Sequence, residues 1–246
     1  MTTPPKLCGD WEALFKDCHS EEPAIGIFKV DENTVTGTFA TETGDLRFLD
    51  GMANTDSLFL STFNGSQAYL FEAAFRNDSI IGEFHSGYRW KQPWYAVRNA
   101  DFKLANDETL TKLDPNKPVA FSFPRAEGGM CSLSDERYKG KVVVVEIMGT
   151  WCPNCLDESR MLNELYGKHH DSGLEMLALA FERFPEKSRA MAAIQHFHDK
   201  LGLDYDMLYA GTANTDTVMS RLPFISHFMS YPTTLLIGRD GTVRHI

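Results

Sequence analysis

The chain has 246 residues, 43% of them apolar and 24% charged, which is ordinary for a soluble globular protein of two domains. Its formal net charge of −10 argues against a nucleic-acid-binding protein, because phosphate binding needs a basic surface. No apolar run approaches the ~20 residues of a membrane-spanning helix, and the residues before Leu7 lack the apolar core of a signal peptide.

The first 20 residues are expected to form a short leader that is helical around Asp10 to Cys18. Cys8 and Cys18 could close a short disulfide-bonded loop in an oxidising compartment, or they could be two unrelated thiols. The spacing leaves both interpretations open, because the geometry of the two side chains decides whether a disulfide forms. Cys131 has no evident partner and is expected to be a passive thiol in a strand.

From Pro23 onward the apolar residues recur with a period of two, which favours strands separated by turns. The expected strands are Val35–Ala40, Leu46–Leu49, Ser57–Ser61, Ala68–Ala73, Ser79–Phe84 and Trp94–Arg98, and the expected turns are Thr43–Asp45, Asn64–Gly65 and Arg76–Asp78. With no helical pattern between them, these strands predict an antiparallel meander that closes into a small barrel or sandwich. The aromatic residues on strand positions are expected to form its core rather than a ligand pocket.

The segment 99–117 has linker composition, so we place a domain boundary within it, with a first domain of residues 1–113 and a second of residues 114–246. In the second domain strand patterns alternate with helical ones, which predicts an α/β domain with a mixed sheet flanked by helices. The expected strands are Val119–Phe123, Val142–Met148, Leu174–Phe181, Thr233–Gly238 and Thr242–Ile246, and the expected helices are Leu156–Tyr166 and Glu186–Leu201.

The segment Trp151–Cys155 carries two cysteines at the junction of the strand Val142–Met148 and the helix that follows. Cys152 is expected at the helix N-terminus, where unpaired N–H groups and a partial positive charge favour a thiolate, and Pro153 suits the first helical position. Cys155 would lie in the same turn, close enough to attack a mixed disulfide formed on Cys152. A zinc knuckle or two ordinary buried thiols are the alternatives, although zinc would want a second Cys-x-x-Cys pair that the sequence lacks.

The order of strand, Trp-Cys-x-x-Cys, helix, strand, helix, Tyr-Pro-Thr and hairpin resembles the thioredoxin fold. The segments Lys139–Val145, Gly149–Cys155 and Tyr231–Thr234 are most similar to its exported TlpA/ResA-type branch, and the resemblance covers residues 118–246. The preceding β-domain more loosely resembles extra β-domains of some exported relatives. The resemblance implies a location in the bacterial periplasm rather than the cytoplasm, with the export signal or anchor absent from this chain. It also implies a closing helix, which is expected to be missing because the chain stops at Ile246.

By the same resemblance, Pro232 would be a cis-proline that faces the cysteine pair, and an extended substrate segment would pair there beside Cys152. Trp151 would shield the pair. The implied substrate-binding residues are Tyr231, Thr233 and Pro153. Without the resemblance, Pro232 would be only a proline at the entry of a strand.

Two acidic residues match buried acids of related modules. Glu158, three residues after Cys155, matches the buried acid of TlpA/ResA-type modules, and Glu146 matches the buried aspartate of thioredoxin itself. A buried carboxyl group has a raised pKa and could accept the proton of the resolving thiol near neutral pH. The alternatives are a solvated acid in the first helical turn for Glu158 and an edge position or a snorkelling side chain for Glu146.

The sequence therefore predicts a two-domain thiol–disulfide oxidoreductase that reduces disulfides of exported proteins and receives electrons from an unidentified thiol donor. Neither a metal nor an organic cofactor is expected, because the two sulfurs are the redox centre. One alternative is a peroxiredoxin-like thiol peroxidase, for which only Thr150 is suggestive. The other is a binding protein whose β-domain recognises a ligand or partner.

Overall fold

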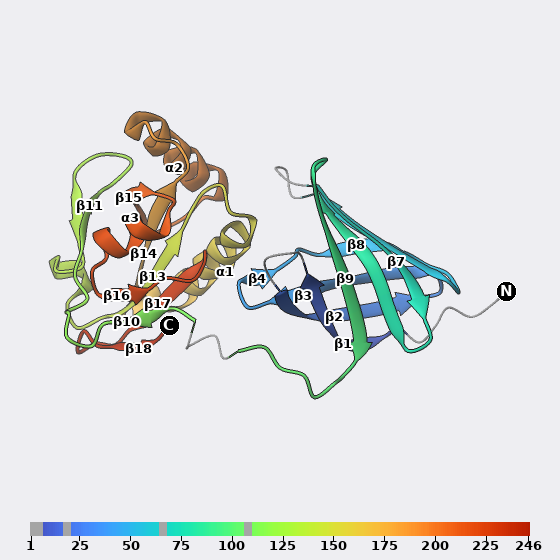
Figure 1. The fold of residues 1–246 in the computed structure, drawn as a ribbon. Coiled ribbons are helices and arrows are strands. Elements are labelled where there is room, and N and C mark those ends of the chain that lie inside the picture. The colour runs from blue at the N-terminus through green and yellow to red at the C-terminus, as the bar shows by residue number, and fades with distance from the viewer. Residues whose placement is uncertain (1–6, 17–20, 64–67, 106–109) are drawn as a thin grey trace. The chain divides into compact units, whose positions relative to one another are not determined.

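A computed structural model of the chain describes residues 7–16, 21–63, 68–105 and 110–246 (Figure 1). The chain forms two compact units, Met1–Ala105 and Asn106–Ile246, so the division falls earlier in the linker-like segment than the boundary placed from the sequence. Cys18 and the expected turn Asn64–Gly65 lie outside the described residues. No helix in the described part of the chain is long and apolar enough to cross a membrane.

The first unit consists of antiparallel strands: β1 (Gly9–Lys16), β2 (Glu21–Asp31), β3 (Thr34–Thr41), β4 (Gly44–Asp45), β5 (Leu49–Ala53), β6 (Ser57–Phe63), β7 (Ala68–Arg76), β8 (Ser79–Ser86) and β9 (Trp90–Arg98). Their order in the sheet is β2-β1-β9-β8-β7-β6-β5-β3-β4. Because β2 also pairs with β3, the sheet closes on itself, and Figure 1 shows the strands wrapping around an interior. The predicted meander is therefore a barrel rather than a sandwich.

Aromatic rings fill the interior of this barrel. Phe15 of β1 lies 5.2 Å from Phe39 and 6.1 Å from Trp94 between ring centroids. Phe71 stacks on Phe39 at 4.9 Å and on Phe84 at 4.5 Å. All these rings are buried, and such pairs add to the free energy gained from the apolar area that they remove from water. The expectation that strand aromatics form the core is confirmed for these rings, whereas Phe48, Phe59 and Tyr95, also on expected strands, are exposed.

Two predictions for this unit are wrong. The first is the helix around Asp10, where the structure has β1: Trp11, Ala13 and Phe15 point into the barrel at every second position, and this period matches pairing with β2 and β9. The second is the strand Leu46–Leu49, of which only the last residue is in a strand. The Asp45 carboxylate accepts a hydrogen bond from the Arg47 N–H at 2.7 Å, and Arg47 has φ of 69°, so a local turn replaces strand pairing there.

The second unit has a central mixed sheet with the strand order β15-β14-β13-β17-β18. Strands β13, β14 and β15 are parallel, β17 pairs antiparallel with β13, and β18 pairs antiparallel with β17, which confirms the expected thioredoxin-like α/β arrangement. Strand β15, helix α3 and strand β16 were not expected from the sequence. The elements are β10 (Lys112–Leu113), β11 (Ser122–Pro124), β12 (Met130–Ser132), η2 (Glu136–Tyr138), β13 (Val142–Met148), α1 (Pro153–His169), η3 (His170–Ser172), β14 (Leu174–Glu182), α2 (Lys187–Leu201), β15 (Asp206–Thr212), α3 (Thr215–Arg221), β16 (Ile225–His227), β17 (Thr233–Ile237) and β18 (Val243–His245).

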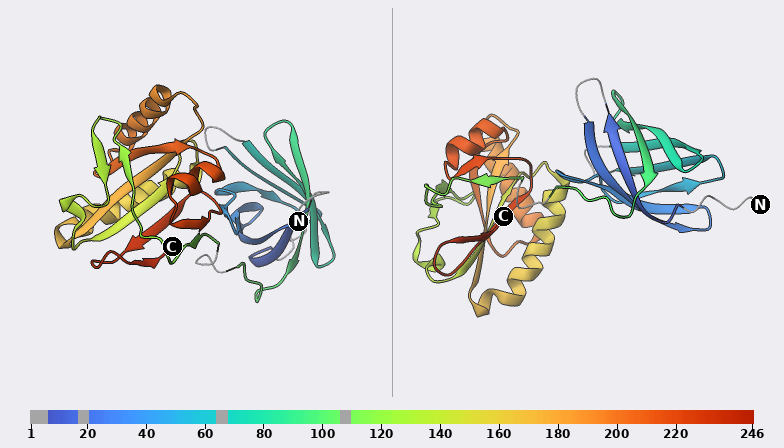
Figure 2. Two further views of the ribbon diagram at one scale, coloured as in Figure 1. Left: turned by 60° about the vertical axis from the view of Figure 1, so that its left-hand side comes forward. Right: turned by 60° about the horizontal axis from the view of Figure 1, so that its bottom comes forward.

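The central sheet has an apolar core on each face. Val143 and Val145 of β13 pack into one core together with residues of α3, and Val144 and Met148 pack into the other together with residues of α1 and α2. Figure 2 shows α1 running along one face of the sheet. Since side chains alternate along β13, Glu146 faces α1 between Val144 and Met148, and an ionisable side chain is thereby placed inside the core.

Candidate active site

The turn between β13 and α1 places the two cysteines at different depths. Cys152 is the N-cap residue of α1, with φ of −92° and ψ of 120°, and Pro153 follows in the first turn, as predicted. Cys152 keeps 8% of its surface exposed, whereas Cys155 is fully buried among the residues of the α1 face. Both thiols are free. Cys152 therefore keeps a small accessible area, whereas its neighbour in the same helical turn keeps none.

The surroundings shift the pKa values of the two thiols in opposite directions. A hydrogen bond from the Cys155 thiol, with further bonds from the backbone N–H groups of Cys155 and Asn154 and the charge of Arg183, lowers the pKa of Cys152 to about 7, although burial opposes this shift. Burial and the interaction with Cys152 raise the pKa of Cys155. Near neutral pH the pair can therefore hold a thiolate at the surface and a protonated thiol behind it.

The loop before β17 lies against Cys152. The Tyr231–Pro232 peptide bond is cis, and the sulfur of Cys152 lies 3.7 Å from the carbonyl oxygen of Tyr231. The Tyr231 ring meets the Trp151 ring edge to face, with 5.4 Å between the ring centroids. Thr233 opens β17, and its hydroxyl donates a hydrogen bond to the carbonyl oxygen of Ser230 at 2.8 Å. The fold thus brings the segment 231–233 to the cysteine pair.

Glu146 is a fully buried acid on the α1 side of the sheet. The hydroxyl of Ser159 in α1 donates to both carboxyl oxygens, each at 3.0 Å, and the Tyr205 hydroxyl lies 3.4 Å from one of them. Burial, with a smaller effect of the Glu158 charge, raises the pKa of Glu146 to about 8. The alternative of an edge-strand or snorkelling side chain is excluded, because Glu146 is 0% exposed in the strand at the centre of the sheet.

Glu158 lies in the first turns of α1 and is only partly accessible to solvent. The Thr234 hydroxyl of β17 donates a hydrogen bond to its carboxyl group at 2.6 Å, so the side chain points toward the sheet. Burial raises the pKa of Glu158, in the direction opposite to that expected of a solvated helix acid. The two acids predicted from the sequence therefore both point into the space between α1 and the sheet.

A third acid, Glu182, was not predicted. It ends β14, and its carboxylate accepts hydrogen bonds from the Thr150 backbone N–H at 2.9 Å and from the Thr150 hydroxyl at 2.8 Å. Glu182 is fully buried, and burial raises its pKa. Because β13 and β14 are parallel, the residues that end them meet at one edge of the sheet, and this register is the signal that could have revealed the contact.

The residues on either side of Glu182 hold Trp151. The indole N–H of Trp151 donates to the carbonyl oxygen of Phe181 at 3.0 Å, and the guanidinium of Arg183 lies 3.8 Å from the centre of the indole ring. Gly149 makes room for this arrangement, because a Cβ atom there would lie 2.3 Å from the indole nitrogen. We call the contacts between residues 149–151 and 181–183 the Trp151 clamp. It fixes the chain directly before Cys152.

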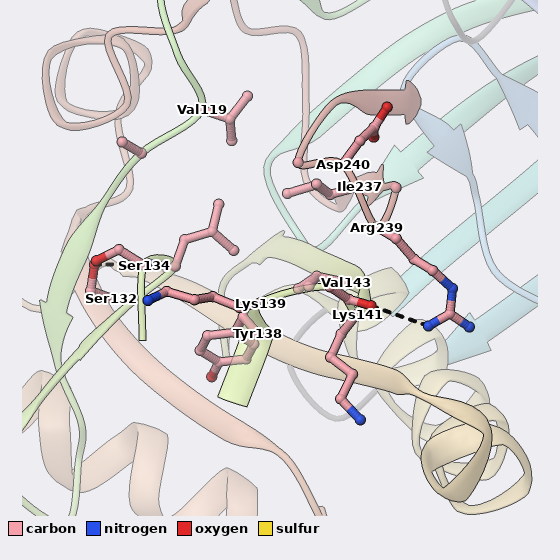
Figure 3. Close-up of a pocket in the computed structure, with 15 residues that line it drawn as sticks. Val119, Ser132, Ser134, Tyr138, Lys139, Lys141, Val143, Ile237, Arg239 and Asp240 are labelled. Atoms are coloured by element: carbon pink, nitrogen blue, oxygen red, sulfur yellow. Dashed lines mark hydrogen bonds between the residues drawn. The ribbon is translucent and has the colours of Figure 1, made fainter. Parts of the chain in front are cut away.

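A pocket of about 370 Å³ opens at the opposite end of β13, where Lys141 and Val143 line it beside the first residue of the strand (Figure 3). Its basic side chains do not converge on one point: in Figure 3, Lys139 and Lys141 extend in different directions. Arg239 donates to the Gly140 carbonyl oxygen at 3.2 Å, and Lys139 pairs with Glu136. Because the pocket lies at the other end of β13 from Cys152 and Cys155, it is separate from the cysteine pair. Among the described residues, no group of three or more His, Cys, Asp or Glu side chains could hold a metal ion.

Curated proteins similar to this chain include two bacterial thiol-disulfide oxidoreductases named ResA. The protein from Bacillus thuringiensis subsp. konkukian is 29% identical over 117 residues, which are 48% of this chain and 59% of the relative. That from Geobacillus kaustophilus is 30% identical over 114 residues, 46% of this chain and 57% of the relative. The chain thus spans less than two thirds of the length of these relatives.

Solved structures include a thiol-disulfide oxidoreductase from Bacteroides fragilis, with 21% identity, a TM-score of 0.40, and coverage of 54% of this chain and 88% of that one. The family model described as AhpC/TSA matches residues 116–246, a stretch that holds the Cys152–Cys155 pair, the cis-proline and the acids Glu146, Glu158 and Glu182. Since this match covers more than half of the sequence, the chain belongs to the AhpC/TSA family.

Proposed function

We propose that this chain is a thiol–disulfide oxidoreductase that reduces protein disulfides through Cys152 and Cys155. The observation that carries the proposal is the unequal setting of the two thiols: Cys152 at the helix N-terminus keeps 8% of its surface exposed, and Cys155 in the same turn keeps none. Disulfide exchange needs this inequality, because the attacking sulfur must be an accessible thiolate while the second sulfur stays protonated until it is needed.

The proposed reaction has two displacements. The Cys152 thiolate attacks one sulfur of the substrate disulfide, forms a mixed disulfide and releases the other substrate sulfur as a thiolate, which takes up a proton. Cys155 then loses its proton, attacks the Cys152 sulfur and releases the second substrate thiol. The Cys152–Cys155 disulfide remains, two electrons have passed to the substrate, and an upstream thiol donor must return them.

Glu146 and Glu158 are proposed to carry protons in the second displacement. The raised pKa of Cys155 means that this thiol needs a base before it can attack. Glu146 faces the same core, its charge acts on Cys155, and a pKa of about 8 lets it take up and release a proton near neutral pH. The charge of Glu158 contributes to that pKa and so helps to tune Glu146.

The cis-proline loop is proposed to bind the substrate. Since the Tyr231 carbonyl lies beside the Cys152 sulfur, an extended substrate segment that pairs with residues 231–233 would bring its disulfide to Cys152. Trp151 and Pro153 would cover the flanks of the pair. By similarity to TlpA/ResA-type modules, we place the protein in the bacterial periplasm, with disulfides of exported proteins as substrates.

A redox titration tests the proposal, with the thiols trapped by alkylation and counted by intact mass. Two thiols should titrate together, and the step should be lost in Cys155→Ser. The midpoint measured against a defined thiol buffer then gives the direction of electron flow. Absence of any two-electron step, or a mass that includes bound zinc, would contradict the proposal.

Two other functions have less support. In a thiol peroxidase the Thr150 hydroxyl would be needed at the reactive sulfur, but it donates to Glu182 instead. In a binding protein the cysteine pair would be dispensable. Partner binding would then survive in Cys152→Ser, and any disulfide turnover measured with the wild type would be retained as well. The oxidoreductase proposal expects Cys152→Ser to lose turnover while partner binding remains.

A further inference from the structure

We infer that Arg183 recognises a negatively charged group beside the substrate disulfide, so that disulfides flanked by carboxylates are the preferred substrates. This inference rests on the proposed oxidoreductase function and adds the chemical class of the substrate to it. Three observations carry it: the guanidinium is held on the ring of Trp151, the residue directly before Cys152; none of the described carboxylates forms an ion pair with it; and the acids of the candidate site are turned inward.

The position of Arg183 is set by the Trp151 clamp. Arg183 directly follows β14, and its guanidinium lies 3.8 Å from the centre of the Trp151 ring. The ring itself is held by the hydrogen bond to Phe181 and by its edge-to-face contact with Tyr231 of the cis-proline loop. A guanidinium stacked on an anchored indole loses much of its freedom before any ligand arrives, which lowers the entropic cost of binding.

The guanidinium remains available to a ligand. Arg183 is exposed, and within the described part of the chain no carboxylate forms an ion pair with it. Stacking occupies the flat face of the guanidinium. The N–H donors lie in the plane at its edge, where their spacing matches the two oxygens of a carboxylate. Its positive charge also acts on Cys152, so it lies within electrostatic range of the reacting sulfur.

The three acids of the candidate site are turned inward and form no ion pair with this charge. Glu146 is bound by Ser159, Glu158 accepts from Thr234, and Glu182 is bound by Thr150. Each is therefore turned inward by a hydroxyl donor. The whole chain carries a net charge of −10, which would repel an anion at long range. At an ionic strength of ~0.1 M charges beyond about 10 Å are largely screened, so the nearby Arg183 decides the preference.

Two small disulfides of matched length and opposite charge test the inference: 3,3′-dithiodipropionate, which carries two carboxylates, and cystamine, which carries two ammonium groups. The rate constant for oxidation of the reduced full chain is measured with each, and their ratio is compared between variants. The ratio isolates charge recognition, because a change in the nucleophilicity of Cys152 alters both rates alike. Because the two disulfides release thiols of different pKa, only a change in the ratio, and not its absolute value, reports charge recognition; in the wild type the anionic-to-cationic ratio should be higher at low salt than at high salt.

Arg183→Gln should lower the anionic-to-cationic ratio by about 5-fold, the size expected for one solvent-exposed ion pair, and Arg183→Lys should keep most of it. Arg189→Gln is the matched control, because that guanidinium stacks on Phe184 at 4.1 Å instead of on Trp151, and the ratio should not change. An unchanged ratio in Arg183→Gln, or equal slowing with both disulfides, overturns the inference alone. A wild-type chain that reacts with neither disulfide overturns the proposed function and this inference with it.

Discussion

At the scale of single residues, the buried Glu146 carboxyl makes stability depend on pH. Its folded-state pKa of about 8 lies above the ordinary value for glutamate, so the stability that it contributes is complete in acid and is lost as the pH rises toward 8. Glu146→Gln removes this titration and can still accept the hydrogen bond of Ser159. As the pH rises from 5 to 8, the wild type should therefore lose on the order of 2–4 kcal/mol of unfolding free energy relative to Glu146→Gln.

Urea unfolding of both proteins at several pH values measures this shift. Ser159→Ala is the companion variant, since it removes the donor to both carboxyl oxygens but leaves the acid in place. Its stability should fall with rising pH more steeply than that of the wild type, because the charged form of Glu146 loses a donor. A difference between wild type and Glu146→Gln that stays constant with pH would show that Glu146 does not titrate in this range.

The Tyr231 hydroxyl is buried and has no hydrogen-bond partner among the described residues. A buried donor without a partner is unfavourable, so Tyr231→Phe should raise the free energy of unfolding by about 1 kcal/mol and keep the ring contact with Trp151. Tyr205→Phe is the matched control and should lower it, because the Tyr205 hydroxyl donates to the Glu146 carboxyl group. Thermal and urea unfolding measure both changes. Destabilisation of Tyr231→Phe would reveal a partner for its hydroxyl.

Which residues of the site can be predicted depends on whether their signal is local. Cys152 and Cys155 are marked by their spacing after an apolar strand, and Glu146 stands out as a charge within that strand. Glu182 and Ser159 carry no such mark. Their roles follow from the parallel register of β13 and β14 and from the face that α1 buries, which depend on tertiary packing.

At the scale of elements, the Trp151 clamp depends on the absence of a side chain at position 149. In Gly149→Ala the new methyl group would lie 2.3 Å from the indole nitrogen and 2.8 Å from the Phe181 carbonyl oxygen, so the indole must move. We expect a loss of about 2 kcal/mol of unfolding free energy and slower disulfide exchange.

Gly167→Ala in α1 is the control for this variant, because a Cβ atom there meets nothing within 4 Å. Alanine is the better helix former, so this change should stabilise the chain by about 0.5–1 kcal/mol and leave exchange unaltered. Urea unfolding and the exchange rate with a small disulfide distinguish the two variants. Equal behaviour of both would mean that Trp151 is not held by the clamp.

Helices and strands could be predicted where the apolar residues follow a single period, either that of a helix or that of a strand. The apolar stripe of α2 and the glycine that ends it, Gly202 with φ of 59°, are visible in the sequence. Strand β1 was mistaken for a helix, because its short apolar run fits both periods until its pairing with β2 and β9 is known. Helix α3 has only 7 residues, too few for a periodic pattern to stand out.

At the scale of the whole molecule, the change from strand-only to alternating patterns was enough to predict two domains. The buried residues confirm that each unit has its own core: the aromatic cluster of the barrel draws only on the first unit, and both clusters on the central sheet draw only on the second. The sequence predicted a meander that closes into a barrel or a sandwich. The choice between the two could not be predicted, because it depends on pairing between β2 and β3 in addition to the pairing of β2 with β1.

Separate cores predict separate folding. Residues 1–105 and 106–246, produced as two fragments, should each unfold cooperatively in urea, because neither core loses a buried member when the chain is cut between them. The second fragment contains every residue assigned to the cysteine site, so its two thiols should titrate together with the midpoint of the whole chain. Cys155→Ser in the same fragment is the control and should abolish that step. If residues 106–246 unfold without cooperativity, or if their midpoint differs from that of the whole chain, then the barrel contributes to the structure or the potential of the redox unit.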